Sequence, residues 1–179
     1  RLIWFKGSIV PIDDAKINVL SPTSQFGANV FEGLRGYWNE MEKQLYIFRL
    51  DEHIIRLKNS MKMIELEADF SDAFLRQSVI DIIRANELKE DLVCRQTVFL
   101  DGLGSWSANG PVEMFIAPMA KGRYYENTQG LDVCISSWER IHEKSLSPKI
   151  KMGANYMNSR MGQLEAIRNG YDSAILTRL

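Results

Sequence analysis

The hydrophobic pattern of the chain changes period at Asp51, and this change limits the folds that the chain can adopt. Before Asp51, apolar residues gather in short runs that are rich in β-branched and aromatic side chains and are separated by turn residues, which is typical of paired strands. The strands expected there are residues 2–5, 9–12, 30–38 and 44–48. After Asp51, apolar residues recur at spacings of three and four, which predicts a helix. These residues are Ile54, Leu57, Met61 and Ile64.

A second helix is expected to start at Ser71, whose hydroxyl can cap it, and strand chemistry returns at residues 92–100 and 112–117. Antiparallel strands combined with two consecutive helices indicate an α+β fold. Beyond a run of turn-forming residues, a strand at 131–136 and a helix that ends at Gly170 begin a second domain. The division expected is a first domain over residues 1–120, a linker over 121–130 and a second domain over 131–179.

The charges of the chain are balanced, which excludes some classes of partner. Its 179 residues include 22 Lys and Arg against 23 Asp and Glu, a formal net charge of −1, so no nucleic-acid partner is expected. The longest apolar run, residues 114–120, contains Pro118 and is far shorter than the roughly 20 residues that cross a bilayer. We therefore expect a cytoplasmic protein with no membrane partner, in which Cys94 and Cys134 are reduced, buried thiols.

Several common catalytic motifs are missing from the sequence. The glycines at 33–36 and 102–104 lack the third glycine or the Lys-Ser/Thr ending of phosphate-binding loops. His53 and His142 stand far apart without paired ligands, so no metal site is expected. The Gly-x-Ser-x-Gly segment of nucleophile-elbow hydrolases does not occur either.

The segment 147–156 places Lys151 among apolar and small residues, just before a helix expected to start near Asn155 or Met157. A lysine there should be partly desolvated and should lie at the positive end of the helix dipole, and both effects favour the neutral amine. The neutral amine is the form that makes Schiff bases. On the residues alone, a solvated lysine at a helix start is the commoner alternative.

Four motifs occur in a fixed order along the chain. They are Trp4-Phe5-Lys6-Gly7, Phe31-Glu32-Gly33-Leu34-Arg35 within residues 26–37, Phe48-Arg49-Leu50-Asp51-Glu52-His53 within residues 48–57, and Lys151-Met152-Gly153-Ala154-Asn155-Tyr156. Together they resemble the class IV (fold type IV) pyridoxal-phosphate aminotransferases, in particular the branched-chain amino acid aminotransferase group. The resemblance implies a two-domain α+β fold like that of D-amino-acid aminotransferase, with the second domain truncated in this chain.

The resemblance also implies roles for six residues. Lys151 would bind pyridoxal 5'-phosphate as a Schiff base and move the substrate α-proton, Tyr156 would meet the phenolate oxygen of the pyridoxal ring, and Arg49 would bind the cofactor phosphate. The substrate would be bound by Phe31, Arg35 and Arg95.

Other residues of these motifs are interpreted as structural. Lys149 has the wrong spacing for the Schiff-base lysine, and His53 with Arg56 is expected to brace the start of a helix. Glu32 is expected to be a hydrogen-bonding partner rather than a base. The stripe that begins with Met157 and Met161 is expected to pack in the core.

Two positions depart from the branched-chain pattern. Val93 stands where the group usually has a tyrosine whose hydroxyl helps to bind the substrate α-carboxylate, and Phe26 replaces a frequent tyrosine. The acidic residue that pairs with the pyridinium nitrogen in the family would follow Leu179. We therefore expect this sequence to be part of a longer protein and not a competent enzyme by itself.

The function expected from the resemblance is transfer of an amino group between a branched-chain or related hydrophobic L-amino acid and 2-oxoglutarate, in branched-chain amino acid biosynthesis. The partners expected are these small molecules and a further copy of the chain, in a homodimer or higher homo-oligomer. The alternatives are an aromatic, D-amino acid or (R)-amine transaminase, an aminodeoxychorismate lyase, and a non-catalytic truncated relic.

Overall fold

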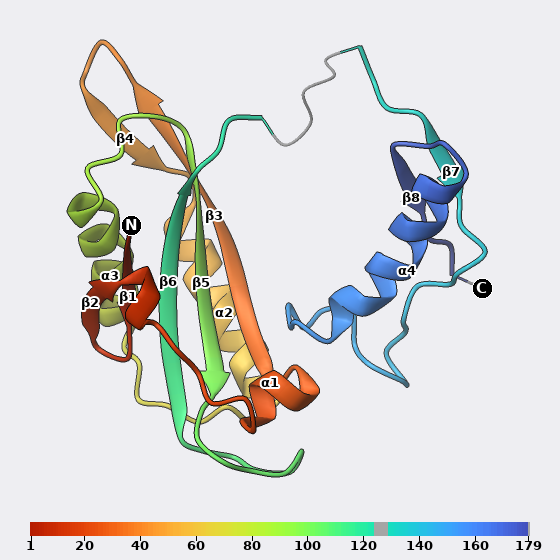
Figure 1. Ribbon diagram of the computed structural model, residues 1–179, viewed down its shortest axis with the longest axis horizontal. Helices are drawn as coiled ribbons and strands as arrows, with labels where there is room; N and C mark the ends of the chain where they lie inside the picture. The colour runs from red at the N-terminus through yellow and green to blue at the C-terminus, as the bar shows by residue number, and fades with distance from the viewer. Residues whose placement is uncertain (124–128, 179) are drawn as a thin grey trace.

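The computed structural model describes residues 1–123 and 129–178. Its elements (Figure 1) are β1 (Leu2–Phe5), β2 (Ser8–Pro11), η1 (Ile12–Asp14), α1 (Pro22–Phe26), β3 (Asn29–Asn39), β4 (Gln44–Ile47), α2 (Leu50–Met63), α3 (Asp72–Ala85), β5 (Leu92–Leu100), β6 (Val112–Ala120), β7 (Val133–Ile135), α4 (Asn155–Arg168) and β8 (Ser173–Ile175). The strands and helices expected from the sequence are confirmed, with small shifts at their ends. The short elements η1 and α1 have no counterpart among the expectations.

The larger sheet has six strands in the order β2-β1-β6-β5-β3-β4, and its neighbouring strands run antiparallel. The long strand β3 pairs with β5 so that Phe31 lies opposite Thr97, Gly33 opposite Arg95 and Arg35 opposite Val93. Since alternate residues of a strand share a face, these positions lie on one face of the sheet.

Helices α2 and α3 cover the opposite face of this sheet (Figure 1). Helix α3 begins where the Ser71 hydroxyl accepts the Phe74 N–H at 3.1 Å, as the sequence predicts. The apolar stripes of the two helices form one core with Val30 and Leu34 of β3, which are fully buried; α2 packs on β3, and α3 on β6 and β1. These stripes are Leu50, Ile54, Leu57 and Met61 in α2, and Leu75, Val79, Ile82 and Ile83 in α3. Each large apolar side chain buried here contributes about 1.5–3 kcal/mol.

The second unit consists of the parallel pair β7 and β8 with helix α4 packed on β8. The expectation that the methionine stripe of α4 packs in a core is wrong for Met157, because this side chain is 57% exposed, and Ile167 is 60% exposed. The helix buries small residues instead: a Cβ on Gly162 would lie 2.6 Å from Cδ1 of Leu176. This close approach admits only a small side chain at position 162, and Met161 and Leu164 are partly buried beside it, whereas Met157 and Ile167 face solvent.

The boundary between the two sheets lies where the sequence predicts the domain boundary. Strands up to Ala120 belong to the larger sheet, and strands from Val133 onward to the smaller one. The expected linker, 121–130, includes residues 124–128, which lie outside the described residues. The division into two domains with this linker therefore stays a prediction.

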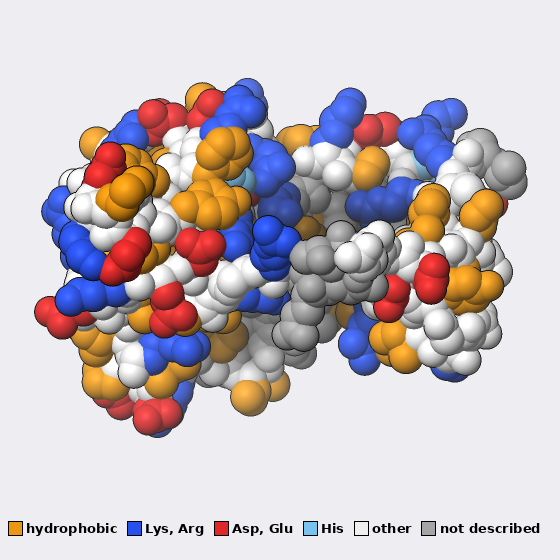
Figure 2. Space-filling model, turned by 90° about the horizontal axis from the view of Figure 1, so that it is seen from above, with side chains coloured by type: hydrophobic (Ala, Val, Ile, Leu, Met, Phe, Trp, Pro, Cys, Tyr) orange, Lys and Arg blue, Asp and Glu red, His pale blue; other side chains and the backbone are white. Residues whose placement is uncertain are grey.

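Acidic and basic side chains are interspersed over the face that Figure 2 displays. Within the described residues, every helix is too short or too polar to span a lipid bilayer.

Candidate functional site

Lys151 lies beside the first residues of β3. Strand β4 pairs with β3 only from Gly36 to Asn39, while β5 covers the other edge of β3. The segment around Lys151 therefore occupies the edge that β4 leaves uncovered, where Met152 forms an antiparallel bridge with Val30. The Phe31 N–H donates to the Lys151 carbonyl at 2.9 Å.

The structure explains why the Lys-Met-Gly-Ala-Asn-Tyr motif has a glycine at position 153 and an asparagine at position 155. A Cβ on Gly153 would lie 2.8 Å from Oδ1 of Asn29, so the close approach to β3 excludes a side chain there. Asn155 is 2% exposed, and its amide donates to the Ser147 carbonyl at 2.9 Å and to the Ile150 carbonyl at 2.8 Å. These two bonds close the loop that leads into Lys151.

The side chain of Lys151 meets two aromatic rings. Its Nζ donates to the Tyr156 hydroxyl at 2.6 Å and lies 4.9 Å from the centroid of the Phe31 ring. The rings of Phe31 and Tyr156 are 5.0 Å apart between centroids. The structure thus brings together three of the residues that the sequence assigns to the site, with Lys151 half-buried as expected.

Arg95 extends this cluster on the same face of the sheet. Its guanidinium carbon lies 4.2 Å from the centroid of the Phe31 ring, in cation–π contact. Its Nε is buried and has no hydrogen-bond partner within the described residues. A buried N–H donor without a partner is costly, so this position suits a negatively charged group of a ligand.

The side chains of Arg35 and Lys149 contact residues outside the cluster of Lys151, Tyr156, Phe31 and Arg95. Arg35 donates to the Gly122 carbonyl at 2.8 Å, and its guanidinium carbon lies 5.5 Å from the Tyr37 ring centroid. Lys149, whose side chain is 74% exposed, forms an ion pair with Glu143 at 3.4 Å. The structure therefore separates the two lysines of this segment, and the ε-amino group that meets aromatic rings is that of Lys151.

Arg49 lies at the start of α2 in a left-handed conformation, with φ of 52°. Its Nε donates to Glu52 at 2.9 Å, and its side chain is 60% exposed. The backbone N–H of Glu52, and then Arg49, lower the pKa of the Glu52 carboxyl. The Arg49 side chain is therefore paired with Glu52 within its own helix start, and the contacts of the described residues do not join it to the Lys151 cluster.

Arg56 is coupled electrostatically to Tyr156 of the cluster, although the sequence motif indicates only a structural role for it. The fully buried Glu32 carboxylate accepts two hydrogen bonds from Arg56, both at 2.6 Å, and contacts His53 Nδ1 at 2.7 Å. These bonds raise the pKa of Arg56, and the electrostatic influence of Tyr156 adds to the effect. Arg56 uses two of its five N–H groups in this way while its side chain stays 51% exposed.

Arg49 and Arg56 line one cavity of about 350 Å³ at the start of α2, together with Phe48, Glu52 and His53. The donors are the guanidinium groups of Arg49, the N-cap of α2, and of Arg56, about two turns further along the helix, and two guanidinium groups are chemistry suited to a phosphate. No sequence signal distinguished Arg56 from the other charged residues of its helix, because its place beside Glu32 depends on contacts between residues far apart in the chain.

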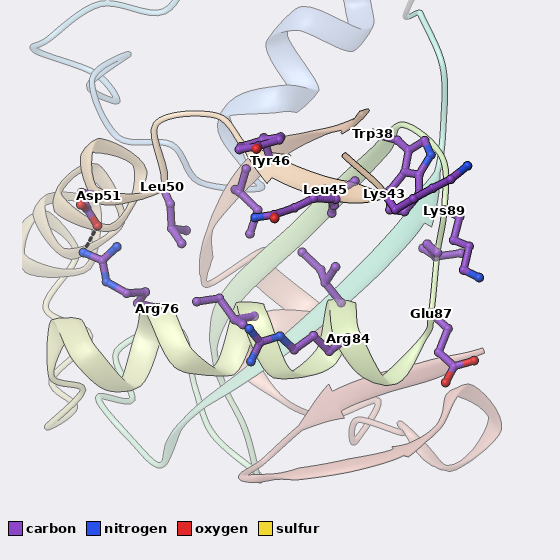
Figure 3. Close-up of a pocket in the computed structure, with 15 residues that line it drawn as sticks. Trp38, Lys43, Leu45, Tyr46, Leu50, Asp51, Arg76, Arg84, Glu87 and Lys89 are labelled. Atoms are coloured by element: carbon purple, nitrogen blue, oxygen red, sulfur yellow. Dashed lines mark ion pairs between the residues drawn. The ribbon is translucent and has the colours of Figure 1, made fainter. Parts of the chain in front are cut away.

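A larger groove of about 890 Å³ lies between β4 and α3 (Figure 3). Leu45 and Leu50 contribute to its apolar lining, and Arg76 on its wall forms an ion pair with Asp51. Neither Lys151 nor its aromatic partners line this groove, so it is separate from the candidate site.

The family described as amino-transferase class IV matches residues 29–178 of the chain, which include all of the cluster described above. The chain belongs to this family. Among relatives of this class IV aminotransferase, a probable branched-chain-amino-acid aminotransferase of Aquifex aeolicus is 34% identical, over 97% of this chain and 56% of the relative. The chain therefore spans little more than half the length of that relative.

Solved structures give the same result for the fold. A branched-chain aminotransferase of the archaeon Thermoproteus uzoniensis, crystallised with norvaline, superposes with a TM-score of 0.93 at 36% identity, over 98% of this chain and 59% of that one. A branched-chain amino acid aminotransferase of Thermobaculum terrenum in its PLP form superposes with a TM-score of 0.88 at 37% identity, over 98% and 58%. The expected α+β fold of the class IV aminotransferases is confirmed.

Proposed function

We propose that this class IV aminotransferase binds pyridoxal 5'-phosphate through Lys151 and transfers an amino group between a branched-chain or related hydrophobic L-amino acid and 2-oxoglutarate. The observation that carries the proposal is the hydrogen bond from Lys151 Nζ to the Tyr156 hydroxyl, beside the Phe31 ring. Bound as a Schiff base, the cofactor supplies an electron sink for the substrate α-carbon.

Lys151 and Tyr156 are proposed to have different roles: Lys151 transfers the proton, and Tyr156 orients the Lys151 nitrogen. With pyridoxal 5'-phosphate bound, Lys151 would hold the cofactor, and its Nζ would be the base that takes the substrate α-proton and returns one. The Tyr156 hydroxyl, which lies 2.6 Å from Nζ in this structure, would orient that nitrogen and would be the group that meets the phenolate oxygen of a bound cofactor.

For the cofactor phosphate, the resemblance favours Arg49 and the geometry favours Arg56. Glu32 binds one edge of the Arg56 guanidinium, which leaves its remaining N–H groups for a phosphate oxygen. We propose that Arg56 makes the closer phosphate contact and that Arg49, on the wall of the same cavity, contributes charge after leaving Glu52.

The substrate is proposed to lie against the Phe31 ring, with a carboxylate at Arg95, whose buried Nε has no partner within the described residues. Arg35 is proposed to contribute at the rim after releasing the Gly122 carbonyl. Because Val93 and Phe26 depart from the branched-chain pattern, a D-amino acid or (R)-amine transaminase or a lyase of the same family remains the alternative.

We also propose a cytoplasmic homodimer or higher homo-oligomer. An exposed aromatic pair supports association with a second copy: Phe26 is 45% exposed and Trp106 80% exposed, and their rings meet edge to face at 6.2 Å. Large exposed aromatic side chains are enriched at interfaces.

Borohydride trapping tests the Schiff base directly. Full-length protein is incubated with pyridoxal 5'-phosphate, reduced, digested and analysed by mass spectrometry, and the cofactor adduct is expected on Lys151. Lys149→Ala, the matched control, should keep the adduct, and Lys151→Ala should lose both the adduct and turnover. An adduct on Lys149, or normal turnover by Lys151→Ala, would refute the assignment.

The substrate class is tested with amino donors paired with 2-oxoglutarate. L-leucine, L-isoleucine and L-valine are expected to react faster than D-alanine and (R)-1-phenylethylamine. A preference for either of the latter two would replace the branched-chain assignment with one of the alternatives.

A further inference from the structure

Ser60 is a serine in the middle of α2 whose side chain contacts a distant part of the chain. A serine inside a helix often donates to the carbonyl four residues before it, as Ser78 of α3 does to Phe74 at 2.8 Å. Ser60 is 1% exposed, and its Oγ accepts the backbone N–H of Lys151 at 3.2 Å, across 91 residues of sequence.

This hydrogen bond completes the backbone contacts of Lys151. The Lys151 carbonyl accepts from the Phe31 N–H at 2.9 Å, and the Lys151 N–H donates to Ser60. The two backbone polar groups of one residue are thus bound by two different elements, β3 and α2. With both groups bound, the direction in which the Lys151 side chain leaves the backbone is fixed.

Ser60 also connects Lys151 with Arg56. The two positions on α2 are four residues apart, so they lie on the same side of the helix, one turn or about 6 Å apart along its axis. The same rigid helix therefore carries the guanidinium proposed to bind the phosphate and the hydroxyl that binds the Lys151 backbone.

We propose that Ser60 is a positioning residue that keeps the Lys151 nitrogen at a fixed separation from the phosphate contact of α2. A cofactor whose phosphate and aldehyde are joined by a rigid ring needs this separation to be constant, because small displacements of reacting groups slow a reaction strongly. Ser60 acts through Lys151 and has no chemical step of its own. This inference rests on the proposed function of Lys151.

Amide hydrogen exchange tests the hydrogen bond in full-length protein without cofactor, so its outcome does not depend on the proposed chemistry. In Ser60→Ala, exchange at the Lys151 amide is expected to accelerate about ten-fold, the effect of losing one such bond. Ser60→Cys keeps most of the volume but weakens the acceptor and should accelerate exchange as well. Ser78→Ala, the matched buried helical serine, should leave exchange at Lys151 unchanged.

Kinetics test the positioning role. The rate at which saturating pyridoxal 5'-phosphate forms its imine with Lys151 is followed by visible absorbance, and it is expected to fall roughly ten-fold in Ser60→Ala. The kcat of transamination should fall with it, whereas KM for the amino donor should change little. Ser60→Thr, which retains the hydroxyl, should restore both rates.

The outcomes separate the two proposals. Lys151 exchange that is unchanged in folded Ser60→Ala, or in Ser60→Cys if the alanine variant does not fold, overturns the inference, and so does a normal imine rate. Failure of unsubstituted protein to form the borohydride adduct on Lys151 would refute the proposed function, while the exchange measurement would still report whether Ser60 binds the Lys151 amide.

Discussion

The ε-amino nitrogen of Lys151 donates a hydrogen bond to the Tyr156 hydroxyl at 2.6 Å, although the two residues belong to different local structures. Lys151 is paired with β3, whereas Tyr156 lies in the first turn of α4. The turn between them, in which the Tyr156 N–H donates to the Gly153 carbonyl at 3.0 Å, brings the hydroxyl back to the amine. The close approach of Gly153 to Asn29 is what allows this path.

Removal of the Tyr156 hydroxyl should slow the reaction without unfolding the protein. In Tyr156→Phe, Lys151 loses its oriented partner, and we expect kcat of full-length protein to fall roughly 100-fold, at the lower end of the range for groups that assist proton transfer. Because Tyr156 is 46% exposed, its contribution to stability should be small, about 1 kcal/mol or less. Steady-state kinetics and thermal denaturation measure the two effects.

Tyr171→Phe is the matched control for this prediction, because Tyr171 is 42% exposed and follows the other end of α4. Its kcat should equal that of the unsubstituted protein. If Tyr156→Phe also retained full activity, the hydroxyl would have no part in the mechanism.

The two arginines that line the cavity beside α2 should differ in their effect on cofactor affinity. Arg56→Gln removes a guanidinium that Glu32 already orients, and we expect the Kd for pyridoxal 5'-phosphate to rise by about ten- to 100-fold, the effect of losing a hydrogen bond to a charged group. Arg49→Gln should raise the Kd by less, about three-fold, because Arg49 must first leave Glu52. Absorbance titration of full-length protein measures both constants, and the reverse ranking would assign the phosphate contact to Arg49.

The ion pair between Glu32 and Arg56 should respond asymmetrically to substitution. Arg56→Met leaves the fully buried Glu32 carboxylate with His53 as its remaining recorded partner, which should reduce the free energy of unfolding by about 3 kcal/mol. Glu32→Gln leaves a guanidinium that is half exposed and can be hydrated, so a smaller loss of about 1–2 kcal/mol is expected. Urea unfolding of the cofactor-free protein measures these losses.

The double substitution Glu32→Gln with Arg56→Met completes a double-mutant cycle for this pair, and Arg84→Met is its control. The double substitution should cost less than the sum of the single ones, because the residues share one network. Arg84→Met, at an exposed position of α3, should change stability by no more than about 0.5 kcal/mol. If Glu32→Gln and Arg56→Met reduced the free energy of unfolding equally, the argument that the buried carboxylate depends more on its partner than the half-exposed guanidinium does would be wrong.

Cys94 should make the stability of the protein depend on alkaline pH. Burial raises the pKa of the Cys94 thiol from 9.0 to about 12, so the folded state keeps its proton at pH values where the unfolded chain loses it. Above about pH 9 the unfolded state therefore gains relative stability, and the free energy of unfolding falls by up to about 1.4 kcal/mol for each pH unit through this group.

Urea unfolding at pH 9 and pH 10, compared between the unsubstituted protein and Cys94→Ala, isolates this contribution. The variant should lose less stability than the unsubstituted protein over this interval, because other titrating groups are common to both. Identical losses would show that Cys94 is accessible to solvent in the folded state.

Local patterns in the chain were enough to predict the helices and strands and to identify the reactive lysine. Periodicity and turn residues predict the strands on both sides of Asp51 and the helices that follow, since the period of apolar residues is a local property of the chain. The motif around Lys151 singled out the lysine, and its neighbour Lys149 proves to be largely exposed and paired with Glu143.

Which of these residues come into contact depends on how the helices and strands pack in space. Arg49 and Arg56 belong to the same motif, and the bonds of Arg56 to Glu32 arise from the packing of α2 on β3, which pattern alone does not encode. The exposure of Met157 has the same cause, because the approach of Gly162 to Leu176 determines which side of α4 is buried. Contacts between residues far apart in sequence depend on how elements pack, whereas periodicity reports only on neighbours along the chain.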